Sequence, residues 1–316
     1  MRNRYLLITP CRDEADYLQH TIDSVASQTV PPAKWVVVDD GSTDETPQIL
    51  ARAVEQYPFI EVVRREDRGR RAVGPGVIDA FYAGLEAVNL DDYDFVCKLD
   101  GDLEFQPRYF ERLMELMAED PLLGNVSGKL YLRYGDRLVE ERLRDDNAIG
   151  PSKFYRTECF KAMGGFVRQV SWDGIDGHMC RLHGWIPAAR EEPELQVIHL
   201  RRMGSSEISF WEGRKRWGRG KYFMGSRFYY VLAQAFYRMF ERPYIISGIG
   251  IVVGYLQAVR ARETRYENPD YLKFFRRYEL ESLFLGRGRT TAKFDREVRE
   301  RHARGEAGKT TPLEHA

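Results

Sequence analysis

Residues 35–44 read WVVVDDGSTD, a short apolar run followed by two carboxylates, a glycine and small hydroxyl residues. The apolar part is continuous, as in a strand that is buried on both faces of a parallel sheet. The strand is predicted to end at Asp39 and Asp40, where carboxylates can accept hydrogen bonds from a ribose or a base. The same string is also typical of a plain turn, in which Ser42 or Thr43 caps the next helix.

Similar apolar runs alternate with helix-period segments over the first third of the chain. They predict strands at Tyr5–Thr9, Trp35–Val38, Ile60–Val63 and Phe95–Leu99, separated by helices at Asp16–Ser27, Thr46–Gln56 and Val77–Val88. This order predicts an α/β fold with a mostly parallel sheet flanked by helices. Weaker patterns predict helices at Pro107–Met117 and Arg156–Met163, and strands near Asn125–Leu132 and at Gln196–His199.

The charge of the chain is unevenly distributed. With 43% apolar and 30% charged residues, the 316-residue chain is an ordered globular protein rather than a disordered or collagen-like one. Its net charge is zero, but residues 1–200 carry 24 basic and 35 acidic side chains, whereas residues 201–304 carry 23 basic and 11 acidic ones. Two parts of opposite charge predict two kinds of partner.

The cysteines and the N-terminus favour a cytoplasmic setting. The four cysteines form neither a CxxC pair nor a metal-finger spacing, so we expect reduced thiols. The apolar stretch Tyr5–Ile8 is too short for a secretory signal peptide.

Asp100-Gly101-Asp102 follows the predicted strand Phe95–Leu99. Two carboxylates so close together are costly unless a cation lies between them. Hard oxygen ligands favour Mg²⁺ or Mn²⁺, which would also bridge a diphosphate. The alternative is a simple turn at the end of a strand.

Three segments together resemble the nucleotide-sugar domain of inverting family 2 glycosyltransferases of the GT-A fold, of the bacterial or archaeal surface-polysaccharide type. They are Thr9-Pro10 with Arg12 and Glu14, the stretch Val38–Asp44, and Asp100-Gly101-Asp102. The resemblance covers roughly residues 4–204. It implies a GT-A-type, Rossmann-like sheet.

The resemblance also implies roles for individual residues. The nucleotide-binding residues would be Pro10, Arg12, Glu14, Asp39, Asp40, Arg71 and Asp100. The Mg²⁺ or Mn²⁺ ligands would be Asp100, Asp102 and His199, with Arg201 and Arg202 near the diphosphate. The segment around Arg71 departs from the family pattern, because arginines stand where the family has an asparagine and small residues.

Residues 171–185, SWDGIDGHMCRLHGW, are similar to the acceptor-site block of that family. Counted back from Gly184-Trp185, the catalytic acid falls on Asp173. Because Trp172 replaces the acid that usually precedes it, Asp176 competes for the role. The resemblance implies that one of these carboxylates takes the proton of the acceptor hydroxyl.

The basic carboxyl half mixes cations with aromatic residues, a composition that first suggests nucleic acid. We expect no nucleic-acid binding, because the neighbouring segment Pro243–Val259 is uncharged and flanked by Arg242 and Arg260. It is marginal for a membrane span, which needs about 20 apolar residues. Three alternatives stay open: helices lying in an anionic membrane surface, a span, or a buried or self-associating face around Gly250-x-x-x-Gly254.

The predicted organisation has three parts. Residues 1–204 form the catalytic domain, residues 205–304 a basic helical extension that is associated with the membrane, and residues 305–316 a disordered tail. The predicted function is metal-dependent inverting transfer of a sugar from a nucleotide-diphosphate sugar to a hydroxyl of a glycan or lipid-linked acceptor, at the cytoplasmic face of the cell membrane. A non-catalytic nucleotide-binding scaffold of a polysaccharide-assembly complex is the alternative.

Overall fold

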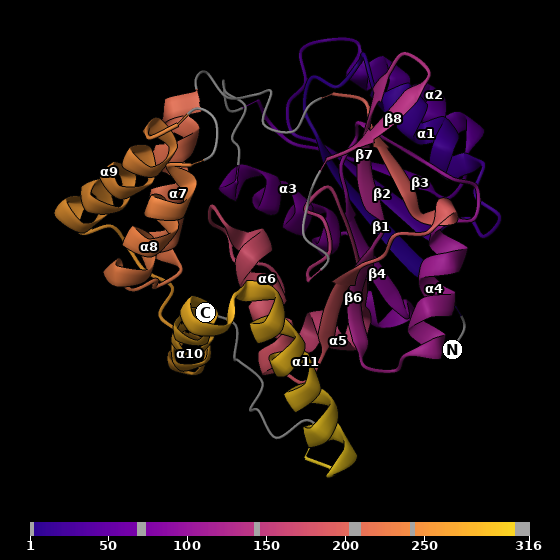
Figure 1. Cartoon of the computed structure of the whole chain (residues 1–316). Helices are drawn as coiled ribbons and strands as arrows, with labels where there is room; N and C mark the ends of the chain where they lie inside the picture. The colour runs from indigo at the N-terminus through magenta and orange to yellow at the C-terminus, as the bar shows by residue number, and fades with distance from the viewer. Residues whose placement is uncertain (1–2, 68–73, 142–145, 202–209, 241–243, 307–316) are drawn as a thin grey trace.

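The computed structural model describes residues 3–67, 74–141, 146–201, 210–240 and 244–306. At its centre lies a seven-stranded sheet of order β10-β6-β9-β4-β1-β2-β3 (Figure 1). Its strands are β1 Tyr5–Cys11, β2 Lys34–Asp39, β3 Ile60–Arg64, β4 Phe95–Leu99, β6 Leu123–Ser127, β9 Ser152–Arg156 and β10 Ile186–Ala189. Only β9 runs antiparallel to its neighbours in this sheet. The prediction of a mostly parallel α/β sheet is confirmed.

A second sheet has the order β5-β11-β7-β8. Its strands are β5 Leu103–Phe105, β7 Lys129–Tyr134, β8 Arg137–Glu140 and β11 Gln196–His199. Strand β11 pairs antiparallel with β5, so that His199 is opposite Leu103. This pairing brings the end of a late strand next to Asp102.

Helices cover both faces of the large sheet. They are α1 Leu18–Ala26, α2 Thr46–Gln56, α3 Pro75–Glu86, α4 Tyr109–Glu119, α5 Thr157–Ala162 and α6 Trp172–Leu182, with single 3-10 turns η1 Leu90–Asp92 and η2 Pro193–Leu195. The predicted strands and helices are present, with ends that coincide or differ by at most two residues. Strands β5, β8, β9 and β10 were not predicted.

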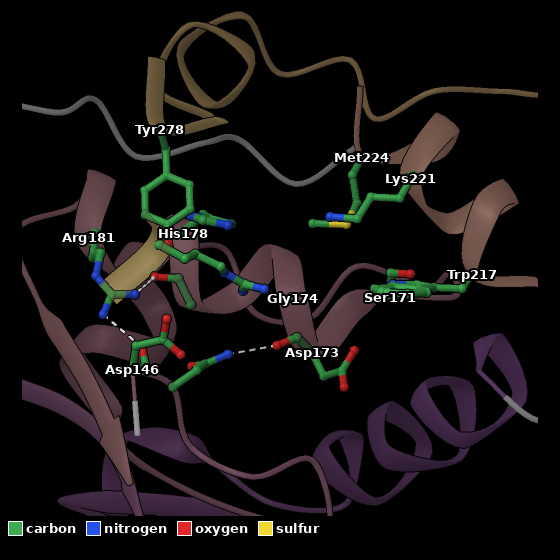
Figure 2. A pocket seen from close by; sticks show the side chains of 13 residues that line it. Asp146, Ser171, Asp173, Gly174, His178, Arg181, Trp217, Lys221, Met224 and Tyr278 are labelled. Atoms are coloured by element: carbon green, nitrogen blue, oxygen red, sulfur yellow. Dashed lines mark hydrogen bonds between the residues drawn. The ribbon is translucent and has the colours of Figure 1, made fainter. Parts of the chain in front are cut away.

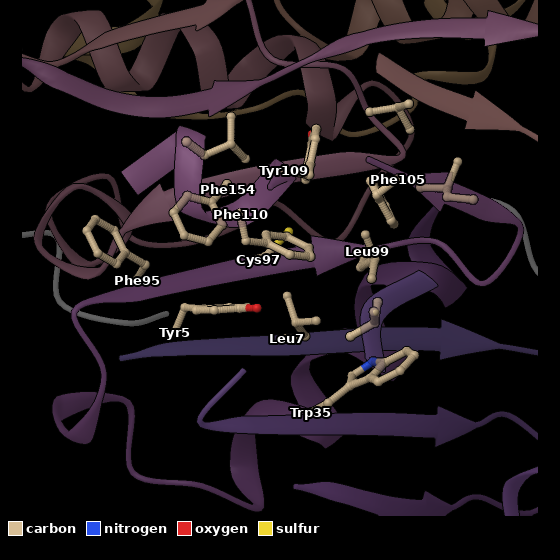
Figure 3. Packing of buried hydrophobic residues seen from close by; sticks show 14 of the residues in the cluster. Tyr5, Leu7, Trp35, Phe95, Cys97, Leu99, Phe105, Tyr109, Phe110 and Phe154 are labelled. Atoms are coloured by element: carbon tan, nitrogen blue, oxygen red, sulfur yellow. The ribbon is translucent and has the colours of Figure 1, made fainter. Parts of the chain in front are cut away.

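The core has two parts, one on each face of the sheet. Tyr5 and Leu7 belong to one cluster, whereas Leu6 and Ile8 belong to the other. Figure 3 shows the first cluster, in which the ring of Tyr5 stacks on that of Phe110 with centroids 4.9 Å apart. Because successive side chains of a strand point to opposite faces, a strand buried on both faces needs an unbroken apolar run.

The described part of the carboxyl half forms five helices: α7 Phe210–Phe223, α8 Phe228–Arg238, α9 Ile246–Ala261, α10 Pro269–Leu285 and α11 Arg287–Ala303. Figure 1 shows α7, α8 and α9 together, apart from the central sheet. A methyl group on Gly218 of α7 would lie 2.0 Å from the carbonyl oxygen of Ile251, and one on Gly254 of α9 would lie 2.0 Å from that of Lys215. The small residues of α9 therefore pack closely against α7 within this chain.

No helix in the described part of the chain has both the length and the apolarity needed to cross a membrane. Two predicted features lie outside the described residues. They are the domain boundary at residues 204 and 205 and most of the disordered tail, from residue 307. The four cysteines are free and buried.

Candidate active site at the carboxyl ends of the strands

The turn after β2 is built around Asp39. Its Oδ1 accepts a hydrogen bond from the backbone N–H of Ser42 at 2.9 Å. Gly41 has φ +76, and a methyl group there would lie 2.5 Å from the Cα of Asp67, so the turn requires glycine. Neither Ser42 nor Thr43 caps α2, which begins at Thr46 without a side-chain cap. The capping alternative is therefore wrong.

The segments after β1 and β2 are tied together by arginines. Arg12 donates to the carbonyl oxygen of Asp40 at 3.1 Å and to the carboxylate of Asp67 at 2.6 Å. Arg65 donates to the carboxylate of Asp40 at 2.9 Å. Pro10, at the end of β1, pairs with Val38 of β2. The structure thus brings the described residues of the predicted nucleoside site to one edge of the sheet.

Asp100 and Asp102 follow β4 at the same edge. The carboxylate of Asp100 forms an ion pair with Lys98 and is about a third exposed. The carboxylate of Asp102 is buried, with its Oδ2 at 3.3 Å from Nε2 of His199 and 2.5 Å from Nε of Arg201. Arg201 also reaches Glu14 at 2.7 Å, which joins the segment after β1 to Asp102.

These contacts shift the pKa values of the cluster. Desolvation raises the pKa of Asp100, although Lys98 opposes it. Burial also disfavours the Asp102 carboxylate, but the hydrogen bond from His199 and the charge of Arg201 outweigh it and lower the pKa of Asp102. Burial by itself would lower the pKa of His199. The hydrogen bond to Asp102 and the negative charge of that residue together outweigh burial, so the pKa of His199 is raised.

The residues of this cluster fit a divalent cation in part. Oδ1 of Asp102 is buried without a hydrogen-bond partner among the described residues, which leaves one oxygen available as a ligand. No group of three or more His, Cys, Asp or Glu side chains able to hold a metal occurs in the described ranges. A cation held by Asp100 and Asp102 would need further oxygen ligands, such as those of a diphosphate.

Asp173 and Asp176 both lie on α6, but in different surroundings. Asp173, in the first turn, is exposed, and no hydrogen bond to its carboxylate is found in the described part of the chain. Its Oδ2 would lie 3.5 Å from a methyl group placed on Gly150. The Gly150 carbonyl accepts a hydrogen bond from Lys98 at 3.2 Å, and Lys98 contacts Asp100. Gly150 and Lys98 thus connect Asp173 to Asp100.

Asp176 is fully buried. Its Oδ2 accepts hydrogen bonds from Lys153 at 2.5 Å and from the hydroxyl of Tyr155. Burial raises the pKa of Asp176, whereas Lys153 lowers it. An acceptor has no access to a carboxylate that is enclosed in this way, so the geometry favours Asp173 as the reactive acid.

Other residues complete the arrangement. Trp172 packs against two lysines that are opposite each other on β4 and β9, with its ring centroid 5.4 Å from Nζ of Lys98 and 5.5 Å from Nζ of Lys153. The sequence did not indicate a role for these lysines, because a lysine within a strand carries no local signal for its partner. Of the predicted residues, Arg71 and Arg202 lie outside the described residues.

Known proteins resemble this chain in sequence and in fold. The family model described as "Glycosyl transferase family 2" matches residues 6–180. Poly-beta-1,6-N-acetyl-D-glucosamine synthase of Staphylococcus aureus is 27% identical over 124 residues, which cover 39% of this chain and 27% of that protein. The chain thus spans only about a quarter of the length of that curated relative.

Two solved structures share the fold. The mannosyltransferase PcManGT from Pyrobaculum calidifontis, in complex with GDP-Man and Mn²⁺, superposes with a TM-score of 0.51 at 17% identity, over 96% of this chain and 88% of that one. Residues 1–349 of S. aureus TarS, in complex with UDP-GlcNAc, give a TM-score of 0.50 at 15% identity, over 96% of this chain and 92% of that one. The GT-A-type fold is thereby confirmed.

Proposed function

Because this chain belongs to glycosyl transferase family 2, we propose that it transfers a sugar, with inversion, from a nucleotide-diphosphate sugar to a hydroxyl group. The observation that carries this proposal is the position of Asp173. It is an exposed carboxylate that is connected through Gly150 and Lys98 to Asp100, at the edge where the nucleoside-site residues also gather. A base and a donor site that adjoin in this way suit a direct displacement.

In the proposed mechanism, each group of residues has one task. Asp39, Asp40 and Glu14 bind and orient the nucleoside, and Arg12 and Arg201 fix these segments. Asp100 and Asp102 would hold a divalent cation, which would supply positive charge to offset the charge that develops on the departing diphosphate. His199 and Arg201 hold Asp102 in place.

Asp173 acts as the general base. It takes the proton of the acceptor hydroxyl while the oxygen attacks the anomeric carbon from the face opposite the diphosphate, which inverts that carbon. Asp176 is a positioning residue, because its contacts with Lys153 and Tyr155 join α6 to β9.

The metal dependence can be tested with Asp100→Asn. Because this change removes one charged ligand, we expect the affinity for the metal and nucleotide together to fall about 10- to 100-fold. Thermal stabilisation by GDP-mannose or UDP-N-acetylglucosamine, with and without Mn²⁺, would measure it. Equal Mn²⁺-dependent stabilisation of wild type and variant would refute the metal site, and an unchanged response in Glu104→Gln, a control on the edge strand β5, would exclude a general charge effect.

The alternative function is a non-catalytic scaffold that binds a nucleotide. The exposed carboxylate of Asp173, which has no hydrogen-bond partner among the described residues, disfavours a scaffold, because such a group suits proton transfer. Donor hydrolysis or transfer over a panel of nucleotide sugars distinguishes the two functions. A protein that binds nucleotide sugars with Mn²⁺ and consumes none of them would be a scaffold.

We further propose that the acceptor is a lipid-linked glycan for a surface polysaccharide, used at an anionic membrane surface on the cytoplasmic side. Support comes from the exposed surface of α8 and α9, which carries large apolar side chains: Leu232, Phe236, Tyr237, Phe240, Ile245 and Ile249. Phe236 and Phe240 are 64% and 67% exposed. Arg227 begins this surface and Arg260 ends it. Apolar side chains beside cations suit the headgroup layer of anionic lipids.

Replacement of two exposed phenylalanines tests the membrane proposal. Phe236→Asp with Phe240→Asp should lower binding to phosphatidylglycerol-containing vesicles at least about tenfold, because two apolar anchors are lost and two negative charges repel the lipid. The fold should persist, since both side chains are exposed. Co-sedimentation measures the effect, with Val139→Asp on β8 as a matched control. Undiminished vesicle binding by the double variant would contradict the proposal.

A further inference from the structure

A cavity opens on the side of Asp173 that faces the carboxyl half. It has a volume of about 270 Å³ and lies among α6, α7, α10 and the start of α11. Figure 2 shows Arg181 and Lys221 entering it from opposite sides, with Asp173 along its lower edge. A group bound there would be adjacent to the proposed base.

Lys221 is the unusual member of this lining. Its residue is only 8% exposed, yet among the described residues no carboxylate lies within ion-pair distance of its ammonium group. Its nearest aromatic neighbours are the rings of Tyr230 and Phe275, at 5.7 and 5.9 Å. Burial lowers the pKa of Lys221 to about 8, against the attraction of Glu279. The side chain is a buried cation without an ion-pair partner, which is costly in the absence of a bound anion.

Other basic groups face the same space. Arg287, at the first position of α11, lines the cavity and forms no ion pair with another described residue. Arg181 also lines it, but its guanidinium is engaged by Asp295 at 2.7 Å. His178 is buried, and its Nδ1 lacks a hydrogen-bond partner among the described residues. Burial lowers the pKa of His178 well below its ordinary value, so the ring is neutral and can donate or accept.

The acidic groups near the cavity either have other hydrogen-bond partners or point elsewhere. Asp146 accepts a hydrogen bond from Thr291 at 3.2 Å. Glu279, behind Lys221, accepts hydrogen bonds from Ser226 at 2.6 Å and from the N–H of Arg227 at 3.3 Å. The Asp173 carboxylate approaches Gly150. Among the described residues that line the cavity, Lys221 and Arg287 are therefore the two cations without an ion pair; Arg287 also has a hydrogen bond with Tyr278.

We propose that this cavity binds a phosphate group of the acceptor through Lys221 and Arg287. A phosphate monoester carries about two negative charges at neutral pH and accepts several hydrogen bonds, which matches one ammonium and one guanidinium group. The cavity also has room for part of the molecule to which the phosphate is attached. That the phosphate belongs to the acceptor rests on the proposed function, whereas the phosphate site itself does not.

The test is calorimetric titration of the full chain at pH 7 with inorganic phosphate and with geranyl phosphate, in the presence of a metal chelator. Lys221→Met and Arg287→Met should each weaken both ligands at least about tenfold, because a charge-assisted hydrogen bond is lost. Arg219→Met removes the same charge from the exposed side of α7 and should leave both affinities within about twofold. Geraniol, which lacks the phosphate, should not bind.

Thermal unfolding separates binding from a structural role. Lys221→Met keeps the length of the side chain and removes a buried, unpaired charge, so the variant should be at least as stable as the wild type. A destabilised Lys221→Met variant that retains full phosphate affinity would overturn the proposal. An equal loss of phosphate affinity in Arg219→Met, or a wild type that binds no phosphate, would also overturn it.

The two ligands distinguish the source of the phosphate. Tighter binding of geranyl phosphate than of inorganic phosphate assigns the site to a lipid-linked acceptor, whereas equal affinities assign it to a phosphate of any acceptor; both support the site. Failure of the proposed function would be seen separately, as absent nucleotide-sugar binding in a wild type that still binds phosphate.

Discussion

Asp173→Asn should lower the rate of sugar transfer by about 10²–10⁴-fold, the usual contribution of a general base. An amide cannot take the proton of the acceptor hydroxyl, so this step loses its base. The change should have little effect on the fold or on donor binding. Asp173 is exposed, its carboxylate has no hydrogen-bond partner among the described residues, and asparagine has nearly the same volume.

The expected pattern is therefore a fall in kcat with donor binding retained. Transfer would be followed by release of the nucleoside diphosphate, and donor binding by Mn²⁺-dependent thermal stabilisation. Asp270→Asn, in the exposed first turn of α10, is the matched control and should leave both unchanged. Full activity of Asp173→Asn would remove Asp173 from the mechanism.

Asp176→Asn should lower the free energy of unfolding by about 3–5 kcal/mol, the usual cost of breaking a buried ion pair on one side. The change leaves the ammonium of Lys153 charged and unpaired in a site from which solvent is excluded. The hydroxyl of Tyr155 would also lose its charged acceptor. The loss is large relative to the roughly 5–15 kcal/mol that stabilises a typical domain.

Chemical denaturation of Asp176→Asn and of the double variant Lys153→Met with Asp176→Leu would measure this effect. Removal of both charges should restore most of the stability, because the pair is replaced by apolar side chains of similar size. The opposite result is equally informative. If Asp176→Asn unfolds like the wild type but transfers no sugar, Asp176 is the base and our assignment of the two acids must be exchanged.

The contrast between these two acids shows what the sequence could not decide. Asp173 and Asp176 are one helical turn apart, and both precede Gly184-Trp185 at an acceptable spacing. Their difference comes from β9, which places Lys153 and Tyr155 against Asp176 and leaves Asp173 in solvent. Strand β9 was itself missed, because its charged residues Lys153 and Arg156 interrupt the apolar pattern.

The donor side was easier to predict. Carboxylates that follow parallel strands collect at one edge of a sheet, so the strand order alone predicted that Asp39, Asp40, Asp100 and Asp102 would be neighbours. The cations that hold them could not be predicted in the same way. Lys98 contacts Asp100 because of the path of the chain after β4. Arg201 contacts Asp102 because β11, which precedes Arg201, pairs with β5.

By itself, the sequence determined the class of fold and the edge of the sheet where a donor site would form. The periodicity of apolar residues is a local property, and it specifies which strands are buried on both faces, as in the alternation of Tyr5 and Leu7 with Leu6 and Ile8. Only the tertiary structure distinguished Asp173 from Asp176 and placed Lys221, which has no ion pair among the described residues, in the cavity that Asp173 also lines. Solvation and pairing of a charge depend on residues far apart in the chain, and no local pattern encodes them.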